Sequence, residues 1–518
     1  MYFTLAVSAA TPEGCAALTD RARITDLAVM PVPGPAAVAW RSPDGRAALL
    51  HWGDPGPAAG ATPATSRAGT IWAGPATPSS GRAPVHARTT LTRVDPVYVA
   101  EVPGAVVVSD RATWAASVAG RLSDHDPLLI CALLNPGFPL GAVTPFAGVS
   151  ALPPSTILHA LSGVPTTVRD EPADRAGDVA TALVAAVTPL REAGEPVELS
   201  LTGGKDSRLV AAALVAAGVP VRARTHGFDD HPDVVIAAEV AKRLGVEHIV
   251  TKPAAPGQQT DVLGRLRATV LVADGMLSAF ENVGRPDPLP AAGVTAGGHG
   301  GELLRGGYAE TAAGRRAAPL RAAELLRRLT TRHVGLLRRG AAASYVASLA
   351  PWTAALARGP LPALDDFYLV NRAGRWSAAA RQAYLLRENL VQPLFDEGVV
   401  RAARAVPLAD RVSGALSRRV LAGLCPPLAD VPLAGKAPAS FDWRRQYGDE
   451  IASFLRDYVL DLGTSGGLFD VVSHSAADKA LTPPHADRGT VWALATLACL
   501  LSGDYRNARE PAAPLSVT

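Results

Sequence analysis

Cysteine and lysine are both scarce in this sequence. No two of the four cysteines form a CxxC pair, which argues against a zinc site of paired cysteines and gives no sign of a disulfide framework. We therefore expect free thiols in a reducing compartment. Only five of the 50 basic residues are lysines, so a lysine inside a motif carries more information here than it usually does.

A large charge excess and a long apolar run are also lacking. The net charge of +3 over 518 residues is too small for a general nucleic-acid-binding role. Residues 1–20 have no positively charged stretch ahead of an apolar core, unlike a signal peptide. The apolar run 491–501, VWALATLACLL, is too short to span a bilayer. We expect a soluble, cytoplasmic protein without nucleic-acid or membrane partners.

The sequence pattern changes near residue 170. Because 518 residues are too many for one hydrophobic core, two or three domains are expected. Residues 1–165 contain short β segments separated by glycine, proline and aspartate. Within them, 53–88 is rich in proline, alanine, glycine and threonine and predicts a loose loop. The strand-like segments are AAVAW (36–40), AALLHW (47–52), VYVAEV (97–102) and AVVVSD (105–110).

Strands and helices alternate in the second region, residues 175–510. The predicted strands are 197–202, 221–226 and 247–251, and the predicted helices between them are 207–217 and 234–244. This alternation predicts an α/β fold with a parallel sheet and helices on both faces. After about residue 310 the chain is expected to be mainly helical.

Two glycines follow the first of these strands, in LTGGKDSR (201–208). At the carboxyl end of a parallel strand, the amides of Gly203 and Gly204 and the following helix N-terminus favour an anion. The hydroxyls of Thr202 and Ser207 add donors. Asp206 belongs beside phosphate only if a metal lies between them, which makes it a candidate magnesium ligand. The spacing excludes the GxxxxGK[ST] loop, and two glycines alone also fit an ordinary strand-to-helix turn.

This string resembles the SGGxDS pyrophosphate loop of N-type ATP pyrophosphatases, in particular the asparagine synthetase class. GGHGGELLRGGY (297–308) is similar to the SGEGSDELFGGY segment of that family, and ENLVQPLFDEGVV (388–400) to its EARVPFLD segment. Further similar segments, in order along the chain, are THGFDDHPDVVIAAEVAKRLGVEHIV (225–250), LVADGMLSAFENVG (271–284) and LAGKAPASFDW (433–443).

The N-terminal region resembles the glutaminase-like domain of the same family. GAVVVSDRATW (104–114) and TPFAGVSALPPSTIL (144–158) are similar to its closing segments. The resemblance implies a degenerate αββα sandwich for 1–165 and a doubly wound ATP pyrophosphatase domain with added helices for 175–510. True amidotransferases have a catalytic cysteine after the initiator methionine, where this chain has Tyr2. Since Cys15 is not N-terminal either, glutamine hydrolysis is not expected.

The resemblance also implies ATP and Mg²⁺ as cofactors. Members of the family adenylate a carboxylate, release pyrophosphate, and let an amine displace AMP. Asp206 and Glu302 would hold Mg²⁺, and Lys436 would place a positive charge on the phosphate oxygens, unless it is a solvated loop lysine. Lys205 either contacts a phosphate or points into solvent. The implied nucleotide-binding residues are Ser200, Thr202, Gly203, Gly204, Lys205, Asp206, Ser207, His226, Asp274, Gly298 and Gly300.

His299 is the candidate general base. Asparagine synthetases have a glutamate at this place and β-lactam synthetases a tyrosine. A histidine can accept the proton of an attacking ammonium near neutral pH, and Asp366 or Glu388 would orient it. The alternative is that His299 only packs within the glycine loop. Tyr368, which is on a helix predicted to border the substrate cleft, is expected to serve as scaffold.

An intact ATP loop without a glutaminase cysteine favours an enzyme whose amine comes from its own substrate. β-lactam synthetases and lasso peptide macrocyclases are of this kind, and the lasso type is slightly preferred. The substrate would then be a small molecule or a peptide, such as a leader-cleaved precursor accompanied by its leader protease and recognition protein. The arginine-rich run 315–339 is either a solvated helix face or a surface for an acidic peptide.

Three other functions fit the sequence. The enzyme could join two separate molecules, as an amidotransferase-like ligase using a free amine or ammonia. A tRNA-thiolating pyrophosphatase is disfavoured by the lack of paired cysteines and of a basic surface. A catalytically weak scaffold partner of a biosynthetic complex is the third.

Overall fold

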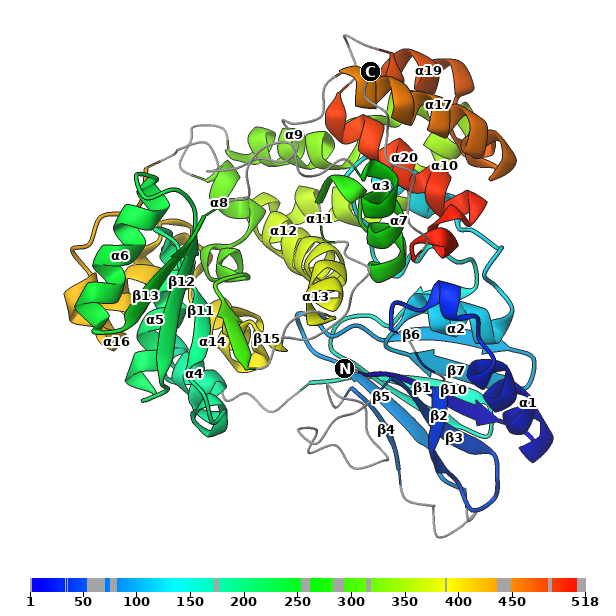
Figure 1. Ribbon diagram of the computed structural model, residues 1–518, viewed down its shortest axis with the longest axis horizontal. Helices are drawn as coiled ribbons and strands as arrows, with labels where there is room; N and C mark the ends of the chain where they lie inside the picture. The colour runs from blue at the N-terminus through cyan, green and yellow to red at the C-terminus, as the bar shows by residue number, and fades with distance from the viewer. Residues whose placement is uncertain are drawn as a thin grey trace.

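Three β-sheets organise the molecule, which is seen here as a computed structural model (Figure 1). The structure describes residues 2–32, 34, 36–53, 70–74, 82–171, 177–252, 261–281, 283, 293–313, 318–386, 389–435, 449–482 and 487–509.

Two antiparallel sheets pack face to face in the N-terminal half. Their strands are β1 (Tyr2–Ala9), β2 (Ala36–Arg41), β3 (Ala47–Gly53), β4 (Ile71–Ala73), β5 (Val85–Thr89), β6 (Tyr98–Val102), β7 (Ala105–Ser109), β8 (Val149–Ala151), β9 (Thr156–Leu161) and β10 (Val164–Arg169). One sheet has the order β2-β3-β1-β7-β6-β8 and the other has the order β10-β9-β5-β4.

The alternation of side chains along β1 separates two layers of core. Leu5 and Val7 pack in a cluster that includes helices α1 (Pro12–Arg23) and α2 (Ala112–Ala119), whereas Ala6 faces the second sheet. On the outer face of the second sheet, the rings of Trp72, His86 and His159 lie against one another. In the described part of the chain the layers are thus helix, sheet and sheet, and the outer helical layer of the expected αββα sandwich is not among them.

The prediction of a loose loop over residues 53–88 is wrong in part. Strand β4 and the first residues of β5 lie within it. Val85 and Ala87 alternate with half-buried residues and fill the space between the two sheets. The alternation was present in VHART, but the proline and glycine content of the surrounding segment obscured it.

The second half contains a parallel sheet, as the sequence predicted, and its strand order is β13-β12-β11-β14-β15. Its strands are β11 (Val197–Ser200), β12 (Val221–His226), β13 (Glu247–Thr251), β14 (Val294–Gly297) and β15 (Asn389–Val391). Their core is shared with the helices α4 (Val179–Val187), α5 (Lys205–Ala216), α6 (Pro232–Leu244), α14 (Glu397–Ala405) and α16 (Ala415–Leu424). The strand order reverses between β11 and β14, where ligands of such sheets bind.

The remainder of the chain is helical, as expected. The further helices are α3 (Pro127–Leu134), α7 (Val262–Val272), α8 (Tyr308–Ala312), α9 (Ala318–Thr330), α10 (Arg339–Ser348), α11 (Ala350–Arg358), α12 (Pro360–Phe367), α13 (Ala378–Leu385), α15 (Leu408–Val412), α17 (Asp449–Ser465), α18 (Leu468–Val471), α19 (His474–Leu481) and α20 (Arg488–Ser502). The 3₁₀ segments are η1 (Leu27–Val29), η2 (Thr188–Glu192), η3 (Ala279–Glu281), η4 (Gly301–Arg305), η5 (Val334–Leu336), η7 (Pro393–Phe395), η8 (Pro426–Leu428) and η10 (Asp504–Asn507), and η6 (Tyr368–Ser377) is a π-helix. Of the described helices, not one has both the length and the apolar character that a bilayer crossing demands.

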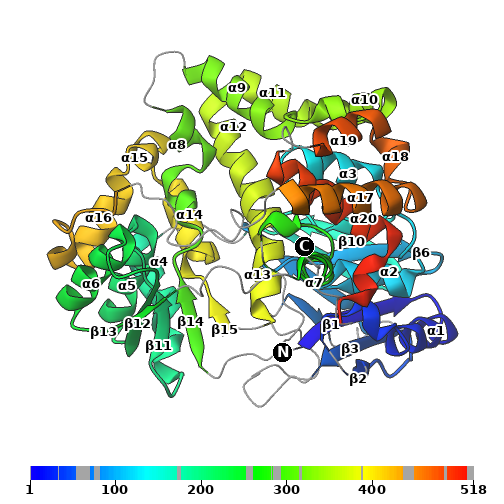
Figure 2. The ribbon, with the colours of Figure 1, turned by 45° about the horizontal axis from the view of Figure 1, so that its top comes forward.

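The two halves share a hydrophobic core. Helices α7, α17 and α20 of the second half belong to the same buried cluster as β1, α1 and α2 (Figure 2). The C-terminal helices therefore cover the N-terminal sheet, and the expected boundary between residues 165 and 175 is crossed by packing. The last N-terminal strand, β10, runs to Arg169.

A buried ion pair fastens the halves together at α2. Asp274 follows α7 with φ of +51°, a left-handed conformation that aspartate tolerates better than most residues. Its carboxylate pairs with Arg111 and accepts hydrogen bonds from the Ala112 amide at 2.9 Å and the Thr113 hydroxyl at 2.6 Å. Since α2 has no side-chain cap of its own, Asp274 supplies the cap from the other half of the chain.

Arg93 makes a second buried connection. Its guanidinium donates to the carbonyls of Gly374 and Val370 in the π-helix η6, and to those of Gly141 and Leu152. Burial lowers the pKa of Arg93 to about 9. The N-terminal half thus satisfies backbone carbonyls of the π-helix.

Removing the buried Asp274 carboxylate should weaken the joint core. In Asp274→Ala, Arg111 stays buried without its partner, which costs about 3–5 kcal/mol, so the urea midpoint of unfolding should fall clearly. Glu247→Ala, which removes the exposed pair of Glu247 with Arg222, is the control and should cost less than about 1 kcal/mol. Equal midpoints for the two variants would contradict the role given to Asp274.

Candidate functional site

The carboxyl ends of β11, β12 and β14 meet at one edge of the parallel sheet. Ser200, the last residue of β11, lies opposite Gly297 of β14 and Arg224 of β12. His226 ends β12 and is exposed. The two loops that follow β11 and β14 are therefore neighbours at the point where the strand order reverses.

Glycines allow the loop after β14 to lie directly against the start of α5. A Cβ at Gly298 would come within 2.5 Å of the Ser207 nitrogen, and one at Gly301 would overlap the carboxylate of Asp206. Gly300 has φ of +98° and lies against the Phe395 ring. A larger residue at Gly298 would push against the backbone of the first loop, and one at Gly301 would displace the Asp206 side chain.

The amides of the first loop are engaged by the protein itself. Gly203 N–H donates to Asp233 Oδ1 at 2.9 Å, and Gly204 N–H donates to Thr202 Oγ1 at 3.2 Å. The Thr202 amide donates to Ser207 Oγ at 3.1 Å. A carboxylate from the first turn of α6 thus stands where the sequence predicts a phosphate. The Gly203 N–H can therefore donate to an anion, and a phosphate that binds at this amide must first displace the Asp233 carboxylate.

The segment that leads to Lys436 is anchored beside this loop. Arg208 of α5 donates to the carbonyls of Val431 at 2.6 Å and Pro432 at 2.9 Å. The Ala434 amide donates to the Gly203 carbonyl at 3.0 Å. Lys436 itself lies outside the described residues.

A cluster of charged side chains fills the space between the two loops. The Arg305 guanidinium pairs with Asp206 and donates to Glu310 Oε2 at 2.9 Å. Lys205 Nζ lies 3.2 Å from Glu310 Oε1. Lys205 therefore has a carboxylate partner, and neither expectation for it, a phosphate contact or a free end in solvent, describes this arrangement.

Burial and pairing act against each other in this cluster. Burial raises the pKa of Asp206, which the Arg305 guanidinium opposes and Glu302 reinforces. Burial alone would lower the pKa of Arg305, but Asp206 and Glu310 outweigh it and raise that pKa. Arg305 is therefore a permanent cation beside Asp206.

Glu302 connects the cluster to the π-helix. Burial raises the pKa of Tyr368, and the nearby negative charge of Glu302 raises it further. The rings of Tyr308 and Tyr368 lie 5.0 Å apart. Burial also raises the pKa of Tyr308, while Arg372 lowers it. Sequence reasoning treated Tyr368 as scaffold, and the structure places it near enough to Glu302 for that charge to act on its hydroxyl.

The expected Mg²⁺ ligands do not fit an ion in this arrangement. Asp206 and Glu302 offer the hard oxygens that Mg²⁺ prefers. However, Arg305 already donates to Oδ1 of Asp206, and its positive charge opposes an ion at this carboxylate. Among the described residues, no three His, Cys, Asp or Glu side chains are grouped to hold a metal. No chemical step below is routed through a metal.

The expected base, His299, has no described contact with Asp366, one of the two acids expected to orient it. The His299 side chain is exposed and has no hydrogen bond or ion pair to any residue that the structure describes. Asp366 pairs with Arg404 at 2.5 Å and lines a different cavity. Glu388 lies outside the described residues. The assignment of His299 as base stays a prediction.

Asp274 was expected to face the nucleotide, and the structure corrects this. Its side chain is 3% exposed, and its two oxygens are used by Arg111, Ala112 and Thr113. The acid at this place serves the contact between the two halves of the chain.

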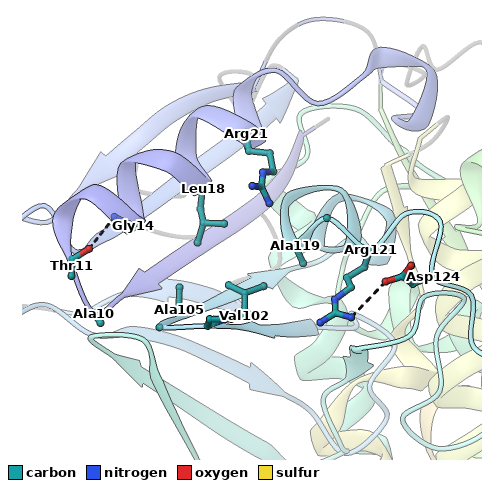
Figure 3. A pocket seen from close by; sticks show the side chains of 13 residues that line it. Ala10, Thr11, Gly14, Leu18, Arg21, Val102, Ala105, Ala119, Arg121 and Asp124 are labelled. Carbon is teal, nitrogen blue, oxygen red and sulfur yellow. Dashed lines mark hydrogen bonds and ion pairs between the residues drawn. The ribbon is translucent and has the colours of Figure 1, made fainter.

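Two cavities lie away from the loop cluster. One, of about 610 Å³, is in the N-terminal half between α1 and the β6–β7 hairpin; Leu18 and Arg21 line it from α1, and Arg121 pairs with Asp124 at 3.5 Å on its other side (Figure 3). The other, of about 630 Å³, lies between β10 and the helices α11 and α12, and is lined in part by Asp366. No residue of the two glycine loops lines either cavity.

Arg305, Glu310 and Asp233 were missed by sequence reasoning. Arg305 stands where the SGEGSDELFGGY segment has phenylalanine, so a comparison letter by letter could have found it. Asp233 lies at the start of α6, 30 residues from Gly203, and only the fold brings the two together.

Residues 178–429, just under half of the chain, match the family model of asparagine synthase. This match supports an asparagine synthetase-like identity for the part of the chain that contains β11, β14 and the loops that follow these two strands. Asparagine synthases are ATP-dependent, AMP-forming ligases that typically use Mg²⁺. The chain matches no curated protein at a significant level.

The close approach of the two loops can be tested at Gly298. In Gly298→Ala the new Cβ meets the Ser207 backbone, so α5 or the loop must shift and ATP binding should weaken by at least about tenfold. Gly340→Ala is the matched control, because no atom lies within 4 Å of a Cβ there and the residue is within helix α10. Calorimetric titration with ATP measures both, and unchanged affinity in Gly298→Ala would show that the loops tolerate separation.

Proposed function

We propose that this protein is an ATP-dependent amide synthetase that joins an amine and a carboxylate within one substrate molecule. The match to asparagine synthase supports ATP-dependent amide-bond formation by adenylation. The observation that carries the proposal is the meeting of the two glycine loops at the switch point of the sheet. There, Gly298 and Gly301 lie against the first turn of α5.

In the proposed first step, a carboxylate oxygen of the substrate attacks the α-phosphorus of ATP. The bond between this phosphorus and the bridging oxygen breaks, and pyrophosphate leaves. The start of α5 offers backbone amides to the departing pyrophosphate, once its oxygens replace the Asp233 carboxylate on Gly203. Arg305 supplies fixed positive charge at the same loops, and Lys436 is proposed to add a second cation.

In the second step, the amine nitrogen attacks the acyl carbon of the adenylate. The nitrogen loses a proton, and AMP leaves with the former carboxylate oxygen. We assign the proton to His299, whose exposed ring follows β14 at the edge of the loop cluster. Neither Asp366 nor Glu388 is needed for this role, since a neutral imidazole accepts a proton without an acid partner.

The source of the amine is proposed to be the substrate itself. Tyr2 stands where amidotransferases carry their catalytic cysteine, and Cys15 is fully buried in α1. Burial raises the pKa of the Cys15 thiol, so it is not an activated nucleophile. A chain that produces no ammonia fits the closure of a ring, as in lasso peptide macrocyclisation or β-lactam formation. The lasso type is preferred; a leader-cleaved precursor peptide, with its leader protease and recognition protein, is then the proposed partner set.

A scaffold function is the second candidate, and one observation favours it. In the structure, the Gly203 amide and the Asp206 carboxylate both have partners from the chain itself. Asp233 accepts from Gly203, and Arg305 pairs with Asp206. A protein that no longer binds a nucleotide would still keep such pairs. An intermolecular ligase that uses a free amine or ammonia follows the same two steps as the proposed enzyme.

Exchange of labelled pyrophosphate into ATP tests the first step. With a panel of amino acids and short peptides as carboxylates, the wild-type protein should catalyse exchange with at least one of them. Asp206→Ala, which removes the carboxylate that holds Arg305, should reduce exchange by about 100-fold. Asp410→Ala, in an exposed pair with Arg419, is the control. Absence of both exchange and ATP binding in the wild-type protein would favour the scaffold.

His299→Ala separates the second step from the first. Adenylation needs no proton acceptor at the amine, so exchange should stay within about threefold of the wild type. Formation of the amide, followed by mass spectrometry as loss of water from one substrate molecule, should slow by about 100-fold or more. An equal loss of exchange and amide formation would remove His299 from the role of base.

A further inference from the structure

Arg305 is buried in a place that family resemblance assigns to an apolar side chain. Its side chain is 8% exposed, and its guanidinium lies between the carboxylates of Asp206 and Glu310. A buried arginine is stable only with partners for its charge. Here one partner is the loop carboxylate that was expected to bind a metal, and the other comes from helix α8.

Lys205 of the first loop reaches the same partner. Its Nζ lies 3.2 Å from Glu310 Oε1. Lys205 and Arg305, which are 100 positions apart in the sequence, thus share the Glu310 carboxylate. The first loop and the segment after β14 are joined by Asp206–Arg305–Glu310–Lys205, with Glu302 close enough to influence Asp206 and Arg305.

The position of the guanidinium conflicts with a metal at Asp206. Mg²⁺ binds carboxylate oxygens at about 2.0–2.1 Å and keeps an octahedral shell of oxygens around it. Arg305 Nη1 donates to Oδ1 of Asp206, which leaves Oδ2 as the oxygen that a divalent ion could use. An ion bound there would lie beside the guanidinium in a largely buried site, where repulsion between like charges weakens its binding.

We propose that Arg305 is the resident cation of the glycine-loop cluster and takes the place of a divalent ion at Asp206. In the free protein its positive charge opposes the binding of divalent ions to Asp206. The inference rests on the proposed function in treating Asp206 as a residue of the nucleotide loop, but its claim about divalent ions requires no turnover.

Removal of the guanidinium should strengthen the binding of a divalent ion at Asp206. Without Arg305, Asp206 loses the neighbouring positive charge that repels a cation, and its carboxylate, with the negative charge of Glu302 nearby, offers hard oxygens suited to Mn²⁺ and Mg²⁺. Titration of the full chain with Mn²⁺ in the absence of nucleotide, followed by the paramagnetic resonance signal of the free ion, measures this. Arg305→Leu should bind Mn²⁺ at least about tenfold more tightly than the wild type.

Two further variants identify the site of the gain. In the double variant Arg305→Leu with Asp206→Asn, the added affinity should disappear. Arg222→Leu removes one positive charge from an exposed pair on β12 and should leave Mn²⁺ affinity unchanged. If Arg305→Leu does not fold, Arg305→Gln keeps a hydrogen-bond donor of similar length without the charge, and it should show the same gain.

Wild-type affinity in Arg305→Leu and Arg305→Gln would overturn the proposal, as would a gain that survives Asp206→Asn. These outcomes are independent of catalysis. If the wild-type protein fails to exchange pyrophosphate but Arg305→Leu gains Mn²⁺ affinity, the proposed function is wrong and the role of Arg305 as resident cation stands. If the wild-type protein exchanges pyrophosphate but Arg305→Leu gains no Mn²⁺ affinity, the proposed function stands and a metal would bind beside Arg305.

Discussion

The contact between the β14 loop and the first turn of α5 is the constraint on which the rest of the site depends. Gly298 and Gly301 leave no room for a Cβ against Ser207 and Asp206, so the loops are close only because these positions are glycine. This contact places Asp206 beside Arg305. The parallel sheet provides the frame, because β11 and β14 are adjacent strands whose carboxyl ends meet where the strand order reverses.

The loops are electrically satisfied without a ligand. Asp233 stands in for an anion at the Gly203 amide, and Arg305 stands in for a cation at Asp206. Buried charges and amides without partners are costly, and these contacts satisfy them in the free protein. In the proposed function an anion replaces Asp233 at the Gly203 amide, whereas Arg305 stays beside Asp206. The net affinity is then lower than the new contacts alone would give, because the hydrogen bond between Gly203 and Asp233 is lost.

Much of this arrangement could be predicted from the sequence, because local patterns encode it. The alternation of residues in 197–251 predicted β11, β12, β13 and the helices α5 and α6, and the glycines predicted the loop after β11. Strands β14 and β15 were not predicted. Contacts between distant segments could not be read in the same way. Asp274 carried the right residue type for a nucleotide site, yet its left-handed backbone turns it toward α2. Arg305 lies in a motif that was read for its glycines and acids, and its partner Glu310 lies beyond that motif.

The central claim is that the start of α5 and the neighbouring glycine loop hold the phosphates of a nucleotide. A crystal structure of the protein grown with AMP and pyrophosphate tests it most directly. The account predicts pyrophosphate oxygens within hydrogen-bond distance of the Gly203 and Gly204 amides, with Asp233 released from Gly203 and a guanidinium N–H of Arg305 on the same anion. Pyrophosphate bound elsewhere, with the Gly203–Asp233 hydrogen bond intact, would contradict it.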